Sequence, residues 1–358
     1  MRIAFIVRST LFTVKGGDTI QIQQTAKHLE KLGVEVDILR THEKIKYEDY
    51  DLFHFFNMTR PADILRHLKY CRKPIVLTPI YIDYSDYDSK QRTGLWRYLF
   101  RFANADTIEY IKTIGRFLLQ KDIWPGFRYI WKGQARSIKT VLKKTNALIT
   151  ATQKEYRLLN HKFDKLPASY QIPLAIDPQI FFESEDVRRD PDLVLCVARI
   201  EGIKNQLNLV KAINNTKYSL LLIGNVAPNH KKYADECRKI AGQNVIFKTH
   251  ISQKELKQYY QTATVHVLPS WFENFGLSTI EAAAMGCQVV VSHKAFITEF
   301  LQDEAFYCDP SDPSSIRKAI DEAAGNIQPS RLKKRILNNL TWDKIAEQTL
   351  TAYKEITV

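Results

Sequence analysis

Short apolar strands and amphipathic helices alternate along this chain, and this order constrains its fold more than any other feature. In the first series, residues 2–7 form an apolar run, residues 20–32 have helical periodicity, and residues 34–39 return as a strand. A strand, a crossover helix and a second strand pack as parallel neighbours, so the order predicts a doubly wound parallel sheet. A second series of the same kind begins with the strand over residues 193–197. With 358 residues, the chain is long enough for two such domains.

We therefore predict an α/β protein with two Rossmann-like domains that face one another across a central cleft. The N-terminal domain is expected over residues 1–174 and the C-terminal domain over residues 175–338, and the segment 171–183, with its two prolines, marks the crossing. The terminal helix within residues 339–358 is expected to pack back on the N-terminal domain. Residues 84–144 interrupt the alternation and predict a long, mainly helical insertion.

The most informative segment is 269–286, where a strand ends, a turn follows and a helix opens near Ser278. Unpaired backbone amides at a helix N-terminus, with the helix dipole behind them, form an anion site. Glu273 in the turn and Glu281 about one turn inside the helix are placed so that a ligand with phosphates could present hydroxyl groups to both carboxylates. Alternatively, Ser278 and Glu281 form a capping box, which would explain Glu281 but not Glu273.

Two further elements bring cations and glycines to strand ends. Arg199 follows the strand over residues 193–197, and Lys204 comes five residues later, where the next helix begins. Two fixed cations there could neutralise a diphosphate leaving group, although each could also be an ordinary exposed charge. Gly16 and Gly17, between the first strand and the first helix, either let the backbone approach a ligand or form a simple tight turn. The loop lacks the G-x-G-x-x-G pattern, which disfavours a dehydrogenase cofactor site.

These three elements, in this order and spacing, resemble the retaining glycosyltransferases of family 4, which have the GT-B fold of two facing Rossmann-like domains. The residues that match the family's E-x7-E motif, its Arg/Lys pair and its glycine loop are Glu273 and Glu281, Arg199 and Lys204, and Gly16 and Gly17. The resemblance is strong over residues 190–358 and weaker over residues 1–80 and 145–180. Residues 84–144 match nothing in the family's pattern.

The resemblance implies a retaining, hexosyltransferase-like enzyme that moves a sugar from a nucleotide-diphosphate sugar to a glycan or lipid-linked acceptor, with no metal and no other cofactor. Arg199 and Lys204 would hold the diphosphate. Glu273 would lie by the transferred sugar, and Glu281 would accept hydrogen bonds from the ribose hydroxyl groups. The segment that would bind the donor in the turn consists of Asn274, Phe275, Gly276 and Leu277. The pathway expected for such an enzyme is the synthesis of surface polysaccharide or another glycoconjugate.

The chain departs from the family pattern in its first domain. Many members have a T-x-H triplet near the cleft, but residues 78–80 here read Thr-Pro-Ile, so Ile80 replaces the histidine and the first-domain catalytic group is open. His54, at a strand end, is one candidate for a catalytic residue, and Tyr81 and Asp83 are others. A buried structural histidine is the alternative interpretation of His54.

The sequence does not predict a metal centre. The five cysteines lie far apart without a C-x-x-C pair, so they form neither a disulfide framework nor a zinc site. Residues 86–88 read Asp-Tyr-Asp, the metal-binding D-x-D of the other large glycosyltransferase fold, but they open the insertion and follow no clear strand. We therefore expect no metal there.

The formal net charge of +13 belongs to the first half of the chain. Residues 1–174 hold 30 basic and 17 acidic residues, whereas residues 175–358 hold 22 of each. Within residues 90–144, 13 basic and 3 acidic residues are interleaved with ten aromatic ones. This composition suits an anionic membrane surface or a nucleic acid, or a solvated basic face over a buried aromatic one. Because no nucleic-acid motif accompanies it, we expect a membrane surface rather than a nucleic acid as partner.

We expect a cytoplasmic enzyme that associates peripherally with the inner membrane face. No apolar run reaches the ~18 residues of a membrane-spanning helix, and the first residues lack the long apolar stretch and cleavage site of a secretory signal. The main alternative is a catalytically silent nucleotide-sugar-binding partner of another transferase, which the missing T-x-H histidine would favour. A nucleotide-sugar epimerase remains a further alternative without motif support.

Overall fold

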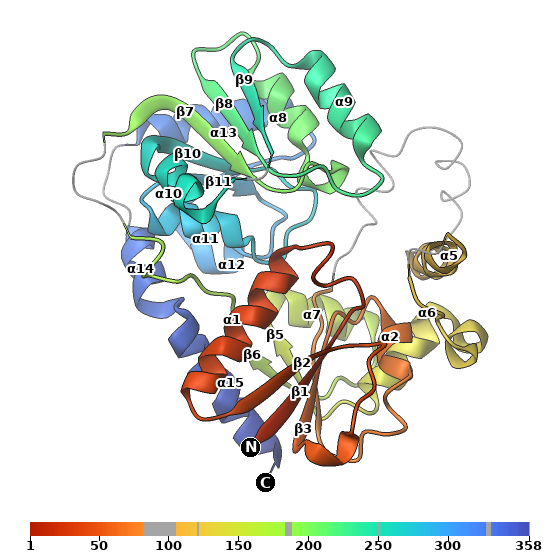
Figure 1. Cartoon of the computed structure of the whole chain (residues 1–358). Coiled ribbons are helices and arrows are strands. Elements are labelled where there is room, and N and C mark those ends of the chain that lie inside the picture. Colours follow the sequence, from red (N-terminus) through yellow and green to blue (C-terminus); the bar gives the residue numbers. More distant parts are fainter. Residues whose placement is uncertain (82–104, 120–121, 183–187, 250, 327–330, 358) are drawn as a thin grey trace. The chain divides into compact units, whose positions relative to one another are not determined.

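The computed structural model describes residues 1–81, 105–119, 122–182, 188–249, 251–326 and 331–357 (Figure 1). These residues form two compact units. One combines Met1–Leu174 with Trp342–Val358, and the other is Ala175–Thr341. Each unit is built on one six-stranded sheet whose strand pairs are all parallel. The predicted α/β class with two doubly wound sheets is therefore confirmed.

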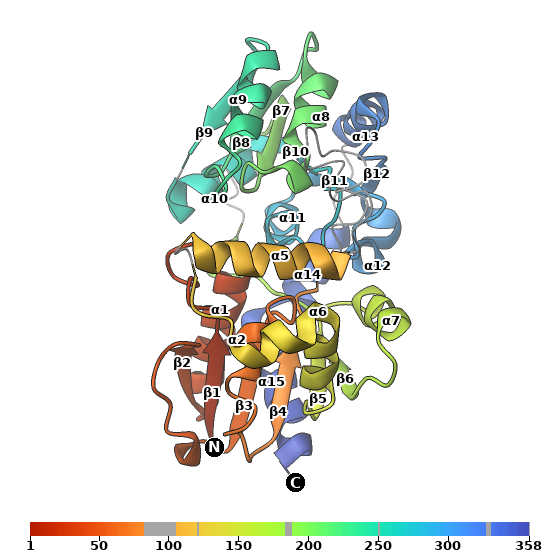
Figure 2. The ribbon, with the colours of Figure 1, turned by 90° about the vertical axis from the view of Figure 1, so that its right-hand side faces the viewer.

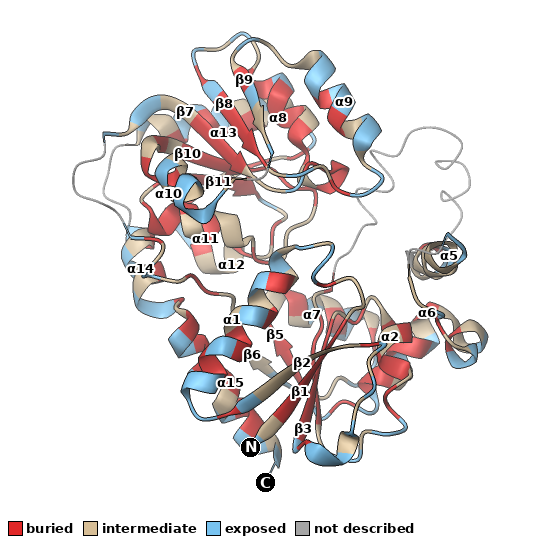
Figure 3. Cartoon of the chain, viewed as in Figure 1, coloured by how far each residue is buried: buried red, intermediate tan, exposed pale blue. Residues whose placement is uncertain are grey.

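The first sheet has the strand order β2-β1-β3-β4-β5-β6. Its strands are β1 (Arg2–Val7), β2 (Glu35–Arg40), β3 (Leu52–Phe56), β4 (Ile75–Thr78), β5 (Ala147–Thr150) and β6 (Ala168–Gln171). The three strands β3, β4 and β5 are buried along their whole length (Figure 3). Parallel strands covered on both faces need apolar side chains at almost every position, which is why these strands read as short apolar runs in the sequence.

Helices from both ends of the sequence pack around this sheet. They are α1 (Gly17–Lys31), α2 (Pro61–Leu65), α7 (Gln153–Lys162) and α15 (Trp342–Thr357), with a 3-10 helix at Tyr47–Asp49. The terminal helix α15 packs against α1. His28 of α1 contacts the carboxylate of Asp343 in α15, with 2.6 Å between Nδ1 and Oδ1. This polar pair joins the two helices at the edge of their apolar contact.

Two more helices lie between β4 and β5, at sequence positions where the long insertion was predicted. They are α5 (Ala105–Leu118) and α6 (Phe127–Leu142). The helix α6 packs against α2, and α5 packs on α6 (Figure 2). The rings of Tyr110 and Tyr129 stack between α5 and α6 with their centroids 5.5 Å apart. Gly133 interrupts α6 with a non-helical φ of 67°, which kinks the helix.

The second sheet has the strand order β12-β11-β10-β7-β8-β9. Its strands are β7 (Asp190–Val197), β8 (Ser219–Ile223), β9 (Val245–Lys248), β10 (Ala263–Leu268), β11 (Gln288–Ser292) and β12 (Phe306–Cys308). The helices of this unit are α8 (Gln206–Ile213), α9 (Lys231–Ile240), α10 (Gln253–Thr262), α11 (Leu277–Ala284), α12 (Thr298–Leu301), α13 (Pro313–Gly325) and α14 (Arg331–Asn339), with 3-10 helices at Gly202–Lys204 and Gln302–Glu304. The apolar core lies between the central strands and α8 and α13.

In each sheet, the first strand of the unit lies where the strand order changes direction. β1 lies between β2 and β3, and β7 lies between β8 and β10. The connections leave to opposite faces on the two sides of such a point, so a crevice opens outside the carboxyl ends of the strands, and ligands of α/β proteins bind there. The fold therefore marks two positions for a site, at the ends of β1 and β3 and at the ends of β7 and β10.

Candidate active site

The second sheet brings predicted cationic and acidic residues together. Arg199 and Lys204 follow β7, and Glu273 follows β10, which pairs with β7. Lys204 and Glu273 are in direct contact, with 2.5 Å between Nζ and Oε2, and both side chains are largely shielded from solvent. Shielding strengthens the attraction between two charges relative to an exposed pair. Residues from distant parts of the sequence thus form one polar site where the strand order changes direction.

Asn205 fixes the loop that carries Lys204. It has a left-handed backbone with φ of 62° between the 3-10 helix and α8. Its buried side-chain amide donates to the carbonyl oxygens of Pro269, at 3.0 Å, and Pro310, at 2.7 Å. The first bond joins this loop to the segment that follows β10, so it helps to set the distance within the ion pair. No local pattern marks Asn205 for this role, and the sequence did not predict it.

Arg199 lies at the same strand end but has another partner. Its guanidinium contacts Glu201, with 2.9 Å between Nη2 and Oε1, and the side chain stays 43% exposed. The carbonyl oxygen of Arg199 accepts a hydrogen bond from the side chain of Gln206 at 2.9 Å. The backbone is therefore fixed while the guanidinium remains accessible to a ligand. The contacts of the described residues do not join Arg199 directly to Glu273.

The turn between β10 and α11 holds Glu273 close to the helix start. Gly276 has a left-handed φ of 71° and immediately precedes α11. A Cβ on Gly276 would lie 3.3 Å from Cγ of Glu273, so a glycine lets the two pack tightly. The Phe275 side chain is buried and tilted against Phe300, with ring centroids 6.3 Å apart. This apolar anchor fixes a turn whose backbone amides, up to Leu277, lead into the helix N-terminus.

Two buried oxygens, one in this turn and one in the first turn of α11, lack hydrogen-bond partners among the described residues. They are Oδ1 of Asn274 and Oγ1 of Thr279. Buried polar atoms in folded proteins are nearly always hydrogen-bonded, and an exception calls for an explanation. Together with the helix start, the two oxygens make this turn a candidate site for a polar ligand.

Glu281 contacts a residue that the sequence did not predict. Its carboxylate accepts a hydrogen bond from the hydroxyl of Tyr260, a buried residue of α10, with 3.0 Å between the oxygens. The alternative capping-box interpretation is wrong, because α11 begins at Leu277 with Gly276 as its N-cap, two residues before Ser278 could serve. Burial raises the pKa of Glu281 to about 7, although the hydrogen bond from Tyr260 lowers it.

The raised pKa of Glu281 predicts a pH-dependent stability. In the unfolded chain this carboxyl ionises near its ordinary value, so the folded state binds the extra proton and the free energy of unfolding falls as the pH rises towards 7. Glu281→Gln keeps an acceptor for Tyr260 but removes the charge. We expect the variant to exceed the wild type in unfolding free energy by roughly 1–3 kcal/mol at pH 8, with a smaller difference at pH 5. Urea titrations at both pH values measure this, and a pH-independent difference would contradict it.

The glycine loop of the first unit is shorter than expected. Gly17 is already the first residue of α1, and Gly16 is its N-cap, with extended backbone. The backbone amide of Gly16 donates to Oγ1 of Thr19 at 3.1 Å. Arg8, directly after β1, holds the loop through two hydrogen bonds to the carboxylate of Asp18, at 2.7 and 3.1 Å. The two glycines therefore lie near the end of β1, and their donor-binding role stays a prediction.

His54 lies in the middle of β3, not at a strand end, and is buried. Its Nδ1 contacts the hydroxyl of Tyr353 at 2.5 Å, and its Nε2 contacts Oγ1 of Thr78 at 2.8 Å. Burial lowers the pKa of His54 to about 3, so the ring is uncharged at neutral pH. Because both ring nitrogens are engaged inside the protein, the contacts fit the structural alternative, and the proposed catalytic role has no support in them.

The structure describes some of the remaining first-domain positions that the sequence singled out. Ile80, in place of the family histidine, has a left-handed φ of 44°, which is strained for a β-branched residue. Tyr81 is buried, and its hydroxyl accepts a hydrogen bond from Lys162. Asp83 and the D-x-D at residues 86–88 lie outside the described residues. Within the part of the chain that the structure describes, no group of three metal-ligating side chains forms a cation site.

Solved structures with the same architecture cover nearly the whole chain. The sucrose-phosphate synthase of Thermosynechococcus elongatus matches 99% of this chain and 98% of its own, with a TM-score of 0.75 and 18% identity. Anabaena HepE, solved in complex with UDP-glucose, matches 99% of this chain and all of its own, with a TM-score of 0.72 and 13% identity. The chain has the GT-B fold.

Sequence comparison finds similarity to glycosyltransferases, most clearly in the second unit. Residues 177–338 match the family model for glycosyl transferases group 1. An uncharacterised glycosyltransferase of Methanocaldococcus jannaschii is 28% identical over 200 residues, which cover 52% of this chain and 51% of that protein. The D-inositol 3-phosphate glycosyltransferase of Acidothermus cellulolyticus is 24% identical over 263 residues, 64% of this chain and 56% of that protein. The chain thus spans about half the length of these curated relatives.

The segment that matches the family model contains the four charged residues that the sequence predicts for the second unit. Arg199, Lys204, Glu273 and Glu281 all lie within residues 177–338.

The described helices offer no apolar stretch long enough to cross a bilayer.

Proposed function

We propose that this chain is a retaining glycosyltransferase of family 4 that moves a sugar from a nucleotide-diphosphate sugar to a glycan or lipid-linked acceptor. The observation that carries the proposal is the contact between Lys204 and Glu273 at the end of β7 and β10. This polar pair lies beside the start of α11, in a unit that matches glycosyl transferases group 1. The pathway proposed is surface polysaccharide or glycoconjugate synthesis, on the cytoplasmic face of the membrane.

Each residue of the site has a part in the proposed reaction. Phosphate oxygens of the donor take the place of Glu273 beside Lys204, and the accessible guanidinium of Arg199 binds the same diphosphate. Both cations stabilise the negative charge that grows on the diphosphate as the bond to the sugar breaks. Glu273, released from Lys204, lies by the sugar, and Glu281 accepts hydrogen bonds from the ribose. The acceptor hydroxyl then attacks the face of the sugar that the diphosphate leaves and gives its proton to the departing diphosphate, so the anomeric configuration is retained.

We also propose that transfer needs no metal ion, because two protein cations balance the charge of the diphosphate. Transfer that continues unchanged in excess EDTA supports this part, and transfer restored only by added Mg²⁺ or Mn²⁺ contradicts it. Anomeric proton NMR of the product tests retention separately.

Donor binding is tested by thermal unfolding with a panel of UDP, GDP and ADP sugars. A ligand that binds only the folded state stabilises it by about 2.7 kcal/mol at 100 times its Kd, so the correct donor raises the unfolding midpoint by several degrees. Lys204→Ala is expected to lose this shift, while Lys231→Ala, on the exposed surface of α9, keeps it. Binding without any transfer or donor hydrolysis would favour the alternative of a catalytically silent partner protein.

A further inference from the structure

Exposed apolar side chains gather where α5 ends and α6 begins. Leu118 and Leu119 are 71% and 67% exposed, Phe127 is 75% exposed, and Trp131 is 87% exposed. Trp124, between them in sequence, is 40% exposed. We call these five residues the apolar tip. Large apolar side chains this exposed are uncommon on a soluble surface unless they serve an interaction.

The apolar tip is continuous rather than scattered. The ring of Trp124 packs edge-on against both Phe117 and Phe127, with centroids 5.0 and 5.4 Å apart. Phe127 and Trp131 are four residues apart in α6 and therefore lie on the same helix face. Leu118 and Leu119 directly follow Phe117 at the end of α5. The rings of Phe117, Trp124 and Phe127 thus form one cluster, with Trp131 on the helix face of Phe127 and the two leucines at the end of α5 next to Phe117.

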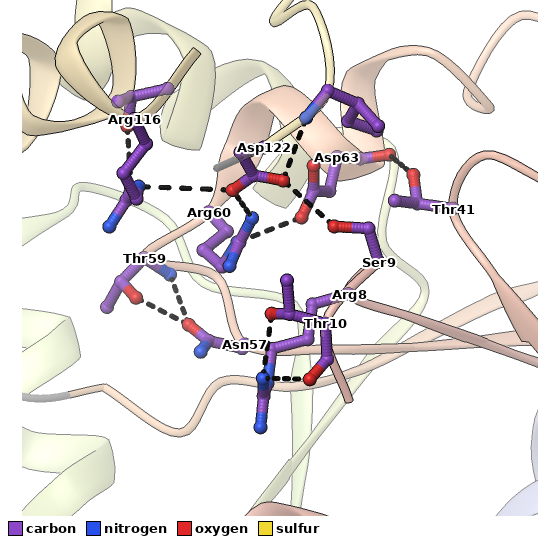
Figure 4. A network of polar contacts seen from close by, with 12 residues as sticks. Arg8, Ser9, Thr10, Thr41, Asn57, Thr59, Arg60, Asp63, Arg116 and Asp122 are labelled. Carbon is purple, nitrogen blue, oxygen red and sulfur yellow. Dashed lines mark hydrogen bonds and ion pairs between the residues drawn. The ribbon is translucent and has the colours of Figure 1, made fainter. Parts of the chain in front are cut away.

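A partly buried polar network holds the apolar tip on the first unit (Figure 4). Asp122, two residues before Trp124, accepts a hydrogen bond from Ser9 at 2.8 Å and contacts the guanidinium of Arg60. Arg60 also contacts Asp63 at 2.9 Å, and Arg116 of α5 lies 3.9 Å from Asp122. Burial acts to raise the pKa of Asp122, but the charges of Arg60 and Arg116 and the hydrogen bonds from Ser9 and the amide of Ile123 together hold this pKa below its usual value.

This network anchors the tip at the carboxyl ends of β1 and β3. The carbonyl oxygen of Trp124 itself accepts a hydrogen bond from Arg66, at 2.5 Å. A charged carboxylate that is paired and hydrogen-bonded in a buried place is costly to move, because separation would leave a buried charge uncompensated. The tip is therefore presented on a fixed platform, and its side chains stay exposed although the backbone beneath them is tied down.

The basic residues around the apolar tip indicate which kind of partner the tip binds. Residues 127–144 contain six basic residues and no acidic one. Arg128 and Lys132, four residues apart, lie beside Phe127 and Trp131 on the first turns of α6, and Arg128 is exposed. Trp and Phe next to Lys and Arg suit the interface of an anionic bilayer, where rings enter the headgroup region and cations meet lipid phosphates. Two exposed leucines favour a bilayer over a nucleic acid, which would stack on rings alone.

We propose that the apolar tip and the basic residues beside it dock this protein on the surface of a bilayer that contains anionic lipids. The inference deepens the proposed function, which expects a lipid-linked acceptor, but lipid binding and donor binding are measured separately. It commits to lipid rather than to a second copy or another protein because basic and apolar side chains occur beside one another on the same turns of α6, with no acidic residue between them.

Vesicle flotation of the full chain tests the proposal. With vesicles of phosphatidylcholine and phosphatidylglycerol at low salt, the wild type is expected to float, and with phosphatidylcholine alone the bound fraction is expected to fall strongly. The double variants Phe127→Ala/Trp131→Ala and Arg128→Glu/Lys132→Glu are each expected to lower partitioning roughly tenfold or more. The matched controls are Ile246→Ala, an exposed apolar residue of β9, and Lys231→Glu/Lys232→Glu on α9, which makes the same charge change elsewhere.

Equal flotation of the wild type and both double variants would overturn the proposal, as would binding that is equal for neutral and anionic vesicles. If sedimentation showed that the wild type forms a dimer, that Phe127→Ala/Trp131→Ala is a monomer, and that neither binds vesicles, the apolar tip would be assigned to contact with a second copy instead. Tight binding of single-stranded RNA that both double variants lose, again without vesicle binding, would assign it to a nucleic acid. A donor-induced thermal shift that persists while flotation fails would leave the proposed function intact and refute only the docking surface.

Discussion

Replacing Lys204 by alanine is expected to lower kcat/KM for sugar transfer by a factor of about 10²–10³, or ~2–4 kcal/mol of transition-state stabilisation. The reason is that the ammonium group lies in a shielded site at a strand end, where it is already in contact with Glu273. Charge that grows on the leaving diphosphate would lose its nearest partner. Glu273→Gln is expected to lower kcat/KM by a similar factor, although glutamine has nearly the same side-chain shape as glutamate. Initial rates with saturating and limiting donor measure both effects.

A control lysine tests whether the loss of activity depends on the position of Lys204 or on the loss of any positive charge. Lys211 lies in α8 of the same unit and is exposed, so Lys211→Ala removes the same charge away from the strand ends. We expect its kinetics to equal those of the wild type. Circular dichroism and urea titration should show that Lys204→Ala still folds. Turnover within a few-fold of the wild type in a folded Lys204→Ala protein would remove the catalytic proposal.

Gly224→Ala is expected to destabilise the second unit by about 3–5 kcal/mol. A Cβ on Gly224 would lie 2.0 Å from the carbonyl oxygen of Ala198 and 2.7 Å from its carbonyl carbon. These are backbone atoms, which cannot rotate away as a flexible side chain could. The φ of 156° at Gly224 further favours glycine. The strands β7 and β8 would have to separate immediately before Arg199, and urea denaturation should show an earlier midpoint.

Gly325→Ala is the control for this prediction. Gly325 ends α13, and a Cβ there would meet no atom within 4 Å. Alanine favours the helix more than glycine does, so the control is expected to be neutral or slightly stabilising. If Gly224→Ala unfolded at the same urea concentration as the wild type, the tight contact between the β7 and β8 loops would not exist in solution.

The fold class was predictable because it depends on local patterns that repeat. Strands buried on both faces, such as β8 with Leu220, Leu221 and Leu222, read as apolar runs, and the helices between them have their own period. The meeting of Lys204 and Glu273 was foreseeable for a related reason. Both follow strands of one parallel sheet, and parallel strands bring their carboxyl ends to one edge.

Other parts of the site depend on contacts that no local pattern records. Tyr260 reaches Glu281 from another helix, and Asn205 bridges two loops, so nothing near either residue in sequence marks its role. The apparent capping box at Ser278 failed because Gly276 adopts a left-handed conformation and starts the helix two residues earlier. His54 was expected at a strand end, but it lies in the middle of β3, where Tyr353 of α15, from the far end of the chain, contacts its ring.

The contact between Lys204 and Glu273 also bears on which anions can bind at this strand end. The ammonium already has a carboxylate as its counterion, so chloride or a single inorganic phosphate would have to compete with a tethered negative charge. Under the proposed function, a donor offers two linked phosphates and a sugar at once. We therefore expect simple inorganic anions to inhibit transfer only weakly.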